Sequence, residues 1–241
     1  MSDLGYVKFQ DNPYRGHMLL VNEVLAHTVP GDRIFEGGIS TGYLSSAFVA
    51  AGRVVDGAEI DPAAAEMAAG TCEKVIVGDL EAIDIDQLAP SYAALVFGDT
   101  LEHLRDPPSV LSRLAPRLQD DGVLVTSIPN VANWAMRMGL LFGRFRYTDR
   151  GILDRTHLRF YTARTVREML ATAGFRVTKL VAAVPVPFVQ SPALSRLAHR
   201  LGNLWPSLFA YTFIITAVKD SGEGTRPAAL APGRAAPWWR R

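Results

Sequence analysis

The sequence has little of several features that would narrow its function at once. Cys72 is the only cysteine, which excludes an intramolecular disulfide and a cysteine-based zinc site and favours a reducing compartment. No apolar run of about 18 residues occurs, and the first residues do not resemble a signal peptide. A formal net charge of +1 provides no field that attracts nucleic acid or an anionic membrane. These absences predict a cytoplasmic protein without a transmembrane segment and argue against nucleic acid as a partner.

The chain does contain an alternating pattern of short strand-like runs and helical stretches. Its composition, 49% hydrophobic and 20% charged residues, is that of a globular protein, and 241 residues favour one domain with modest extras. Glycine, or aspartate followed by proline, stands at many of the expected helix ends. The expected strands are 33–35, 53–60, 74–77, 93–97, 123–128, 175–182 and 209–218, and the expected helices are 41–51, 61–70, 106–121 and 162–173. Such alternation predicts an α/β fold, in which a parallel sheet is covered by helices on both faces.

Two segments interrupt the alternation and are interpreted as substrate cover. Residues 130–161 carry many aromatic and methionine side chains, and residues 185–206 form a smaller insert. In open α/β sheets such inserts usually lie over the carboxyl ends of the strands, where ligands bind. The stretch 134–147 mixes apolar residues with arginines, so it fits either a lid or an interfacial membrane helix, and a lid needs no membrane. Residues 220–241, rich in Pro, Gly, Ala and Arg, are expected to be a disordered tail.

A glycine-rich segment, Glu36 to Gly42, joins the first expected strand to the first helix. Glycines let the backbone approach a ligand closely, and the start of a helix offers free N–H groups. The spacing does not match the Gly-x-Gly-x-x-Gly pattern of dinucleotide-binding proteins, because Ile39 stands where the second glycine is required. Starting at Gly38, the segment also matches the Gly-x-Ser-x-Gly pattern of the nucleophile elbow in hydrolases. However, the rest of the sequence offers no plausible order of residues for a catalytic triad with Ser40. The segment therefore predicts a ligand site of another kind.

Further motifs follow this segment in order along the chain. They are Glu59-Ile60-Asp61-Pro62, Gly78-Asp79-Leu80 and Phe97-Gly98-Asp99-Thr100-Leu101-Glu102-His103-Leu104. With the glycine-rich segment they resemble class I S-adenosylmethionine (SAM)-dependent methyltransferases, although Ser40 replaces the commonest middle glycine of the first motif. The resemblance covers roughly residues 6–218 and implies one methyltransferase domain over 1–219. It also implies a Rossmann-like methyltransferase fold, with a seven-stranded, mostly parallel sheet, helices on both faces and a lid insert.

The resemblance also assigns cofactor contacts to residues of this chain. It implies that Glu59 accepts hydrogen bonds from both ribose hydroxyls, that Ile60 packs on the adenine, and that Asp79 accepts from the adenine amino group. Glu36 and Gly38 are expected at the methionine end, where the carboxylate of Glu36 favours a cationic cofactor. In the alternative, these carboxylates are solvated loop residues. The complete expected cofactor-binding set is Glu36, Gly38, Ser40, Gly42, Glu59, Ile60, Asp79, Leu80 and Asp99.

His103 is the candidate catalytic residue. It follows the fourth expected strand, where the cofactor and the acceptor meet in the family that the chain resembles. A histidine there can take a proton from an acceptor hydroxyl near neutral pH. In the alternative, His103 only holds its loop by hydrogen bonds.

A divalent metal is a further hypothesis for the same region. Asp99, Glu102 and His103 lie at i, i+3 and i+4, which one helical turn would place on one side, and His157 could complete the set. The pattern resembles the Glu-x-x-Glu-His metal site of small-RNA 3′-end methyltransferases and some ubiquinone-pathway O-methyltransferases, with aspartate in place of the first glutamate. Oxygen and nitrogen ligands suit magnesium, manganese or zinc. In the alternative, Glu102 pairs with Arg105 on a solvated face.

One string in the larger insert bears on the acceptor. It resembles a branch of these methyltransferases often found beside glycosyltransferases, which implies sugars or glycan precursors as acceptors. An internal structural role is favoured over RNA binding, because Asp149 and Asp154 offset the basic charge. The string is Asp154-Arg155-Thr156-His157-Leu158-Arg159-Phe160-Tyr161.

The expected function is therefore SAM-dependent O-methylation of a sugar-containing or other small polar metabolite. The alternatives are methylation of a natural-product hydroxyl or amine, and a non-catalytic SAM-binding module beside a glycosyltransferase. The sequence leaves the oligomeric state open.

Overall fold

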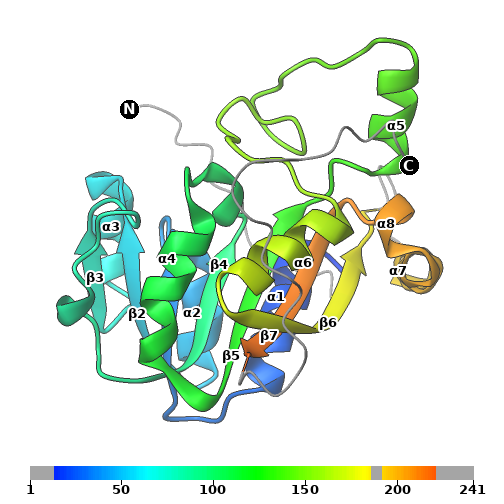
Figure 1. The fold of residues 1–241 in the computed structure, drawn as a ribbon. Coiled ribbons are helices and arrows are strands. Elements are labelled where there is room, and N and C mark those ends of the chain that lie inside the picture. Colours follow the sequence, from blue (N-terminus) through cyan, green and yellow to red (C-terminus); the bar gives the residue numbers. More distant parts are fainter. Residues whose placement is uncertain (1–13, 186–191, 221–241) are drawn as a thin grey trace.

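The computed structural model describes residues 14–185 and 192–220, which build a layered α/β fold (Figure 1). One seven-stranded sheet has the order β3-β2-β1-β4-β5-β7-β6. Strands β1 to β5 pair in parallel, and β7 runs antiparallel to both of its neighbours, as predicted for a mostly parallel sheet. The strands are β1 (Arg33–Gly37), β2 (Val54–Glu59), β3 (Lys74–Val77), β4 (Tyr92–Gly98), β5 (Leu118–Pro129), β6 (Phe175–Ala183) and β7 (Thr212–Lys219).

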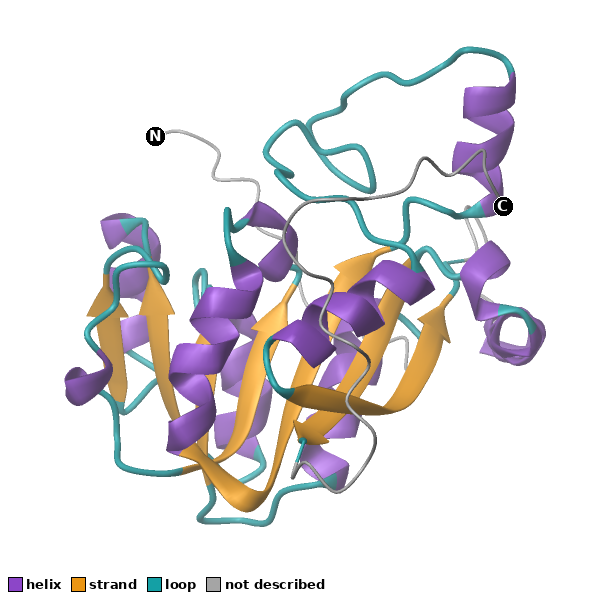
Figure 2. Cartoon of the chain, viewed as in Figure 1, coloured by secondary structure: helices purple, strands orange, loops and turns teal. Residues whose placement is uncertain are grey.

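Helices cover both faces of this sheet (Figure 2). The α-helices are α1 (Gly16–Ala26), α2 (Tyr43–Ala50), α3 (Pro62–Ala69), α4 (Pro107–Leu114), α5 (Trp134–Leu141), α6 (Ala163–Thr172), α7 (Pro192–Leu204) and α8 (Pro206–Phe209). Short 3₁₀ turns are η1 (Ile85–Gln87), η2 (Leu101–His103) and η3 (Ala115–Arg117). Helices α4 and α6 bury their apolar sides in one core cluster, whereas α1, α2 and α3 bury theirs in a second.

The two clusters exist because side chains alternate along each strand. Phe35 and Leu95 belong to the cluster under α4 and α6, and their neighbours Ile34 and Ala94 belong to the cluster under α1 and α2. Successive residues of a strand point to opposite faces, so a strand buried on both faces is apolar throughout. This continuous burial explains why the strand-like runs are legible in the sequence.

Helix ends follow the predicted chemistry at α3 but not at α2. The side chain of Asp61 accepts a hydrogen bond from the N–H of Ala63 at 2.9 Å, and Pro62 occupies the first turn of α3. Helix α2 starts at Tyr43 and not at the predicted residue 41. Ser40 (φ 51°) and Gly42 (φ 77°) have left-handed backbone conformations, which interrupt a right-handed helix.

Other boundaries differ from prediction because distant parts of the chain meet. Strand β5 starts at Leu118 and not at residue 123, since Leu118 pairs with Tyr92 of β4. Strand β7 starts at Thr212 and not at residue 209, because Pro206–Phe209 form the short helix α8. The predicted inserts contain the helices α5 and α7, and α7 packs against β6. Their role as substrate cover stays a prediction, and of the predicted disordered tail only Asp220 lies within the described residues.

None of the helices in the described part of the chain is both long and apolar enough to cross a membrane.

Candidate functional site

The candidate site lies where the strand order reverses between β1 and β4. Strand β1 leads to a helix on one side and β4 to elements on the other, so their carboxyl ends flank a crevice, the usual ligand position in open α/β sheets. Glu36 and Gly37 end β1, and Gly98 ends β4. The glycine-rich segment therefore begins at this crevice.

The backbone after β1 fits tightly against the end of β4. A Cβ atom on Gly38 would lie 2.6 Å from Cγ2 of Thr100, and the φ of Gly38 is +73°, so only glycine is accommodated. The hydroxyl of Thr100 donates a hydrogen bond to the carbonyl of Gly37 at 3.0 Å. Ser40 has a left-handed φ of 51°, which explains why a glycine is the commoner residue there in the family that the sequence resembles.

Glu59 joins the glycine-rich loop to the start of α3. Its Oε2 accepts a hydrogen bond from the backbone N–H of Ser40 at 2.7 Å, and its Oε1 accepts one from the N–H of Asp61 at 2.9 Å. These two bonds hold the carboxylate in one orientation at the carboxyl end of β2. Lone pairs remain on both oxygens, so the carboxylate can accept further bonds from a ligand.

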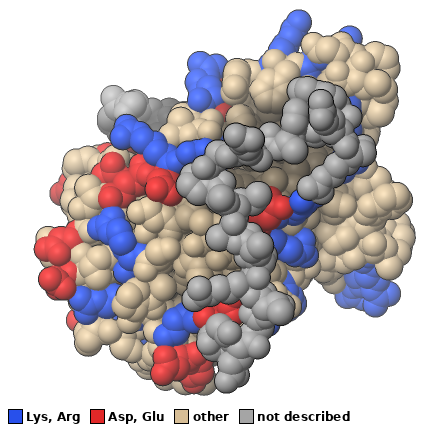
Figure 3. Space-filling view, viewed as in Figure 1, with Lys and Arg blue, Asp and Glu red and all other residues tan. Residues whose placement is uncertain are grey.

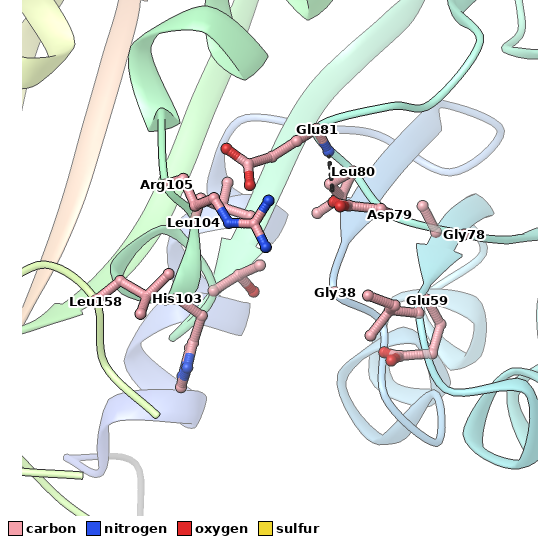
Figure 4. Close-up of a pocket in the computed structure, with 13 residues that line it drawn as sticks. Gly38, Glu59, Gly78, Asp79, Leu80, Glu81, His103, Leu104, Arg105 and Leu158 are labelled. Atoms are coloured by element: carbon pink, nitrogen blue, oxygen red, sulfur yellow. Dashed lines mark hydrogen bonds between the residues drawn. The ribbon is translucent and has the colours of Figure 1, made fainter. Parts of the chain in front are cut away.

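A cavity of about 240 Å³ opens beside Glu59 (Figure 4). It brings together many of the predicted cofactor-binding residues and the predicted catalytic residue, namely Gly38, Glu59, Ile60, Asp79, Leu80 and His103. Ile60 is 67% exposed and Leu80 is buried, so the cavity offers apolar surface beside carboxylates. Asp79 is also held locally, since its Oδ1 accepts the N–H of Glu81 at 2.9 Å. The alternative was that the carboxylates are solvated loop residues. That alternative gives no reason for Glu59 and Asp79 to line the same cavity.

The cavity has two walls with different chemistry. In Figure 4, Glu59 and Asp79 lie on one side, and His103, Leu104 and Leu158 lie on the other. Sequence reasoning missed several of its lining residues: Thr100, Glu81, Arg105 and Leu158. Thr100 lies within a recognised motif, and Glu81 and Arg105 each follow one directly. Leu158 comes from the larger insert, and no local pattern predicts that contact.

Glu36 lies in β1, two residues before Gly38 of the cavity wall, and is buried. Its side chain is 1% exposed, and its Oε2 accepts a hydrogen bond from Oγ of Ser45 at 2.5 Å. Burial raises the pKa of Glu36 to about 8, against the opposing effect of the Ser45 hydrogen bond, and the charge of Glu59 adds to the rise. A cation bound nearby would favour the ionised carboxylate and release a proton.

Asp99 forms a cluster with two residues that sequence reasoning missed. Its Oδ2 lies 3.5 Å from Nε2 of His17, and the hydroxyl of Tyr43 lies 3.4 Å from the same nitrogen. Within the described residues, the buried Oδ1 of Asp99 has no hydrogen-bond partner. Burial raises the pKa of Tyr43, as do the charges of Asp99 and Glu36. His17 belongs to α1, which carries no motif, so only the folded chain reveals this cluster.

Glu102, His103 and His157 meet at the opposite wall. Their potential ligand atoms all lie within 4.8 Å of one another, and Oε1 of Glu102 is 4.0 Å from Nε2 of His157. Asp99, the fourth residue of the metal hypothesis, lies outside this group. It precedes the η2 turn with a left-handed φ of 49°, so the single helical turn expected for Asp99, Glu102 and His103 does not form.

Glu102 is a buried carboxyl without a local partner. It is 1% exposed, and neither oxygen has a hydrogen-bond partner among the described residues, so the alternative of a solvated pair with Arg105 is wrong. Burial raises its pKa well above the usual value, and Asp99 contributes to the rise. An orphaned carboxyl beside two imidazoles fits a divalent cation, which would supply the missing partner.

Both histidines have one ring nitrogen at a backbone carbonyl. Nδ1 of His103 lies 3.2 Å from the carbonyl oxygen of Thr156, and Nδ1 of His157 lies 3.2 Å from that of Ile152. A proton on each Nδ1 donates there, which leaves Nε2 with its lone pair. Burial lowers the pKa of His103, and the neighbouring His157 lowers it further. His103 is therefore neutral near pH 7 and able to accept a proton.

The Asp154–Tyr161 string holds this wall together from the insert. The backbone N–H groups of Leu158 and Arg159 both donate to the carbonyl of Glu102, at 2.9 and 3.0 Å. The guanidinium of Arg159 donates to the carbonyl of Arg105. These contacts are internal to the fold, which is the role favoured for the string over RNA binding.

A second cavity, of about 400 Å³, lies under α5. Its wall combines apolar side chains with three arginines: it is lined by Asn133, Ala135, Met136, Gly139, Arg144, Arg146, Thr148, Arg150, Ile152, Leu153 and Tyr211. The carbonyl of Ile152 contacts His157, so the loop that forms this cavity also reaches the histidine pair.

Comparisons with known proteins bear on the family and the fold. A family model described as a methyltransferase domain matches residues 12–180. No curated protein sequence gives a match. Among solved structures, magnesium protoporphyrin IX methyltransferase from Synechocystis with bound SAH is 18% identical, with a TM-score of 0.59 over 84% of this chain and 81% of that one.

Other solved structures share the same fold at low identity. A SAM-dependent methyltransferase from Archaeoglobus fulgidus is 17% identical, with a TM-score of 0.58 over 85% of this chain and 95% of that one. A TehB-like SAM-dependent methyltransferase from Corynebacterium glutamicum is 16% identical, with a TM-score of 0.55 over 85% and 88%. Because the family model spans more than half of the chain, the protein belongs to the methyltransferase-domain family and is a class I SAM-dependent methyltransferase.

Proposed function

We propose that the cavity beside Glu59 receives the adenosine part of SAM, and that the methionine part extends toward Glu36 and Asp99. Glu59 would accept the ribose hydroxyls, Ile60 would pack on the adenine, and Asp79 with Leu80 would contact its edge. Gly38, Ser40 and Gly42 form the loop that passes the cofactor. When bound, SAM supplies the methyl group from a cationic sulfonium.

Two carboxyl groups at the methionine end support this orientation. The orphaned Oδ1 of Asp99 is an acceptor that a cofactor ammonium group would satisfy, and Glu36 adds a carboxyl that ionises near a cation. Apolar and acidic surface at the other end suits adenine and ribose. The two ends thus match the two chemically different halves of the cofactor.

The reaction that we propose is methyl transfer to a hydroxyl group of a sugar-containing or other small polar metabolite. The observation that carries it is the position of His103, which lines the same cavity as Glu59 while its Nδ1 faces the Thr156 carbonyl. The free Nε2 would take the hydroxyl proton as the acceptor oxygen takes the methyl group. Positioning of the two reactants would contribute much of the acceleration, up to roughly 7 to 11 kcal/mol.

The arginine-lined cavity supports an acceptor that carries negative charge. Arg144, Arg146 and Arg150 line it together with apolar side chains, and guanidinium groups bind phosphate in a bidentate manner. Sugar phosphates and other glycan precursors have this combination of charge and hydroxyls. The resemblance of the Asp154–Tyr161 string to the glycosyltransferase-associated branch points to the same acceptor class.

Transfer of a labelled methyl group from SAM into host extract tests the proposal. We expect label in glycans or sugar nucleotides when the extract is fractionated into glycans, lipids, small metabolites and RNA. The His103→Gln variant should lose about 10²- to 10⁴-fold in turnover, because general base catalysis typically contributes that much. The affinity of this variant for S-adenosylhomocysteine should stay unchanged. The control variant is His27→Gln, which changes the histidine that follows the last residue of α1, and it should behave as wild type.

Each alternative function predicts a different result of this experiment. If label appears only in the hydroxyls or amines of natural products, the acceptor is a natural product and not a sugar-containing metabolite. Label found only in RNA would contradict the proposed acceptor class. The cellular phenotype of each variant tests the last alternative. A phenotype that is normal with His103→Gln but lost with Glu59→Ala would identify a non-catalytic SAM-binding module beside a glycosyltransferase.

A divalent cation at Glu102, His103 and His157 is a second proposal for the same wall, supported by the orphaned Glu102 carboxyl. We expect Mn²⁺ or Zn²⁺ to bind the cofactor-free protein in calorimetric titration and to raise its melting temperature. Glu102→Gln should weaken this binding about tenfold or more, because it removes the only anionic ligand of the group. Glu168→Gln, on exposed α6 surface, is the matched control. A metal bound to Nε2 of His103 would occupy the lone pair that a general base needs, so the metal proposal and the base proposal exclude each other. Failure of all tested divalent ions to bind would remove the metal and leave His103 as the base.

A further inference from the structure

The outer face of α5 is apolar and exposed. Trp134, Met138, Leu141 and Phe142 are spaced to share one side of the helix and its end, and they are between 44% and 72% exposed. Ala135, Met136 and Gly139 line the arginine cavity from another side of the helix. Helix α5 therefore covers a cavity with one face and presents large apolar side chains to solvent with another.

Helix α7 repeats this arrangement. Leu194, Leu197, Leu201 and Leu204 recur every three or four residues and are 39% to 82% exposed. Ser195 and Gly202, on a different face, are buried, and Val184 after β6 would contact a Cβ on Gly202. An amphipathic helix normally turns its apolar stripe toward the core, whereas α7 turns its leucines to solvent.

Helix α8 connects the two exposed faces into one region. The amide of Asn133, which caps α5, donates to the carbonyls of Phe209 and Ala210, and the side chain of Arg137 reaches the carbonyl of Ser207. Helix α8 directly follows α7 and packs against it. In Figure 1, α5, α7 and α8 lie together at one end of the molecule, beyond β6, and Figure 3 shows mostly uncharged side chains with scattered basic ones at this end.

The charge of these segments has one sign. No aspartate or glutamate occurs from Gly122 to Thr148 or from Pro192 to Lys219. Arginines flank the apolar faces in both segments: Arg137, Arg144 and Arg146 around α5, and Arg196 and Arg200 on α7. Within the described ranges, neither Arg144 nor Arg200 has a carboxylate within salt-bridge distance. The charges of these two arginines are therefore not paired with a carboxylate of the described residues.

We propose that α5, α7 and α8 form a docking surface for an anionic membrane, on which the protein binds peripherally. Exposed Leu, Phe and Trp side chains flanked by arginines are the pattern of helices that lie in the membrane interface. The arginines pair with anionic lipid headgroups, and the apolar side chains enter the boundary of the acyl chains. A second copy of the chain would present the same excess of positive charge, so the charge of these segments favours an anionic lipid surface. Arg144 and Arg146 also line the cavity proposed for the acceptor, whereas Arg196 and Arg200 of α7 lie outside it, so the membrane proposal rests mainly on α7 and on the exposed face of α5.

Co-sedimentation of the full-length protein with vesicles tests this proposal. We expect binding to phosphatidylcholine vesicles that contain phosphatidylglycerol, weaker binding to pure phosphatidylcholine, and a further loss at high salt. The Leu201→Glu/Leu204→Glu variant should bind about tenfold more weakly or worse, because it removes apolar contact and adds repulsive charge. Met67→Glu makes the same kind of change on the exposed surface of α3, at the other end of the sheet, and should bind as wild type.

Several outcomes would overturn the membrane assignment. One is wild-type protein that stays in the supernatant with anionic vesicles, and another is a double variant that binds like wild type. A dimer in sedimentation that the double variant dissociates, without vesicle binding, would assign the surface to a second copy. Titration with S-adenosylhomocysteine on the same samples checks that the variants are folded. Failure of that titration in wild type would contradict the cofactor site and leave the vesicle result standing.

Discussion

Glu59→Ala is expected to weaken binding of S-adenosylhomocysteine by at least about a hundredfold. The substitution would remove the two charge-assisted hydrogen bonds proposed to ribose, each worth about 1.5 to 3 kcal/mol, and it frees the N–H groups of Ser40 and Asp61 that shape the loop. Calorimetric titration measures the change directly. Because Glu59 is partly exposed and contacts only loop backbone, the melting temperature of the cofactor-free protein should change little.

Two further variants separate the charge of Glu59 from its shape. Glu59→Gln keeps one acceptor oxygen and should lose less affinity than Glu59→Ala. Glu66→Gln alters an exposed carboxylate on α3 outside the cavity and should bind as wild type. Undiminished affinity in Glu59→Ala would show that the cofactor lies elsewhere and would remove the basis for every role proposed around this cavity.

Glu36→Gln is expected to stabilise the cofactor-free protein at neutral pH while it weakens cofactor binding. The pKa of Glu36 is about 8 in the folded chain and about 4.5 when exposed, so the folded state holds a proton that the unfolded state has released. The free energy of unfolding therefore falls as pH rises from about 4.5 to 8. Glutamine has no such penalty, so at pH 7 the variant should gain up to about 3 kcal/mol.

Urea unfolding between pH 5 and 8.5, with roughly half-unit steps, tests this prediction. The curves of wild type and Glu36→Gln should converge toward acid pH and separate as pH rises, whereas Glu73→Gln, at an exposed carboxylate, should run parallel to wild type. The affinity of Glu36→Gln for SAM should fall about tenfold or more, since a buried carboxylate near a cation is lost. A variant that is less stable than wild type at pH 7 would mean that Glu36 is ionised in the folded protein.

These two glutamates show different routes from sequence to site. Glu59 can be singled out in the sequence because it ends a strand and precedes an Asp-Pro helix start, and in the structure it lines a cavity together with Asp79 and His103. Glu36 can be recognised in the sequence as part of the glycine-rich motif. Its burial and its raised pKa cannot be predicted from that motif. Burial depends on how α2, β1 and their neighbours pack, and no local pattern reports it.

The arrangement of Glu102, His103 and His157 was the part of the site that the sequence predicted least. Sequence spacing suggested that Asp99, Glu102 and His103 share a helical turn, but the left-handed backbone at Asp99 directs that residue toward His17. His103 and Thr156 are 53 residues apart, and only the docking of the insert brings them into contact. The approach of His157 to Glu102 and His103 likewise results from that docking.

The exposed helices show the same limit at the surface. The sequence of 134–147 fits a lid or an interfacial helix equally well, because its period does not say which face is covered. In the structure, Trp134 and Leu141 are exposed, so the face of α5 that carries them is the open one. The leucine stripe of α7 would have been read as a core stripe by its period alone.

The sequence by itself determined the α/β fold class, the order of most strands and helices, and the motifs of a SAM-dependent methyltransferase. Those features are set by local properties: continuous apolar strands, glycines, and aspartate-proline helix starts. The sheet order, the burial of Glu36 and Glu102, the clusters around His17 and His157, and the open faces of α5 and α7 were decided only by tertiary structure. They depend on contacts between residues far apart in the chain, whose geometry is established when the helices pack on the sheet.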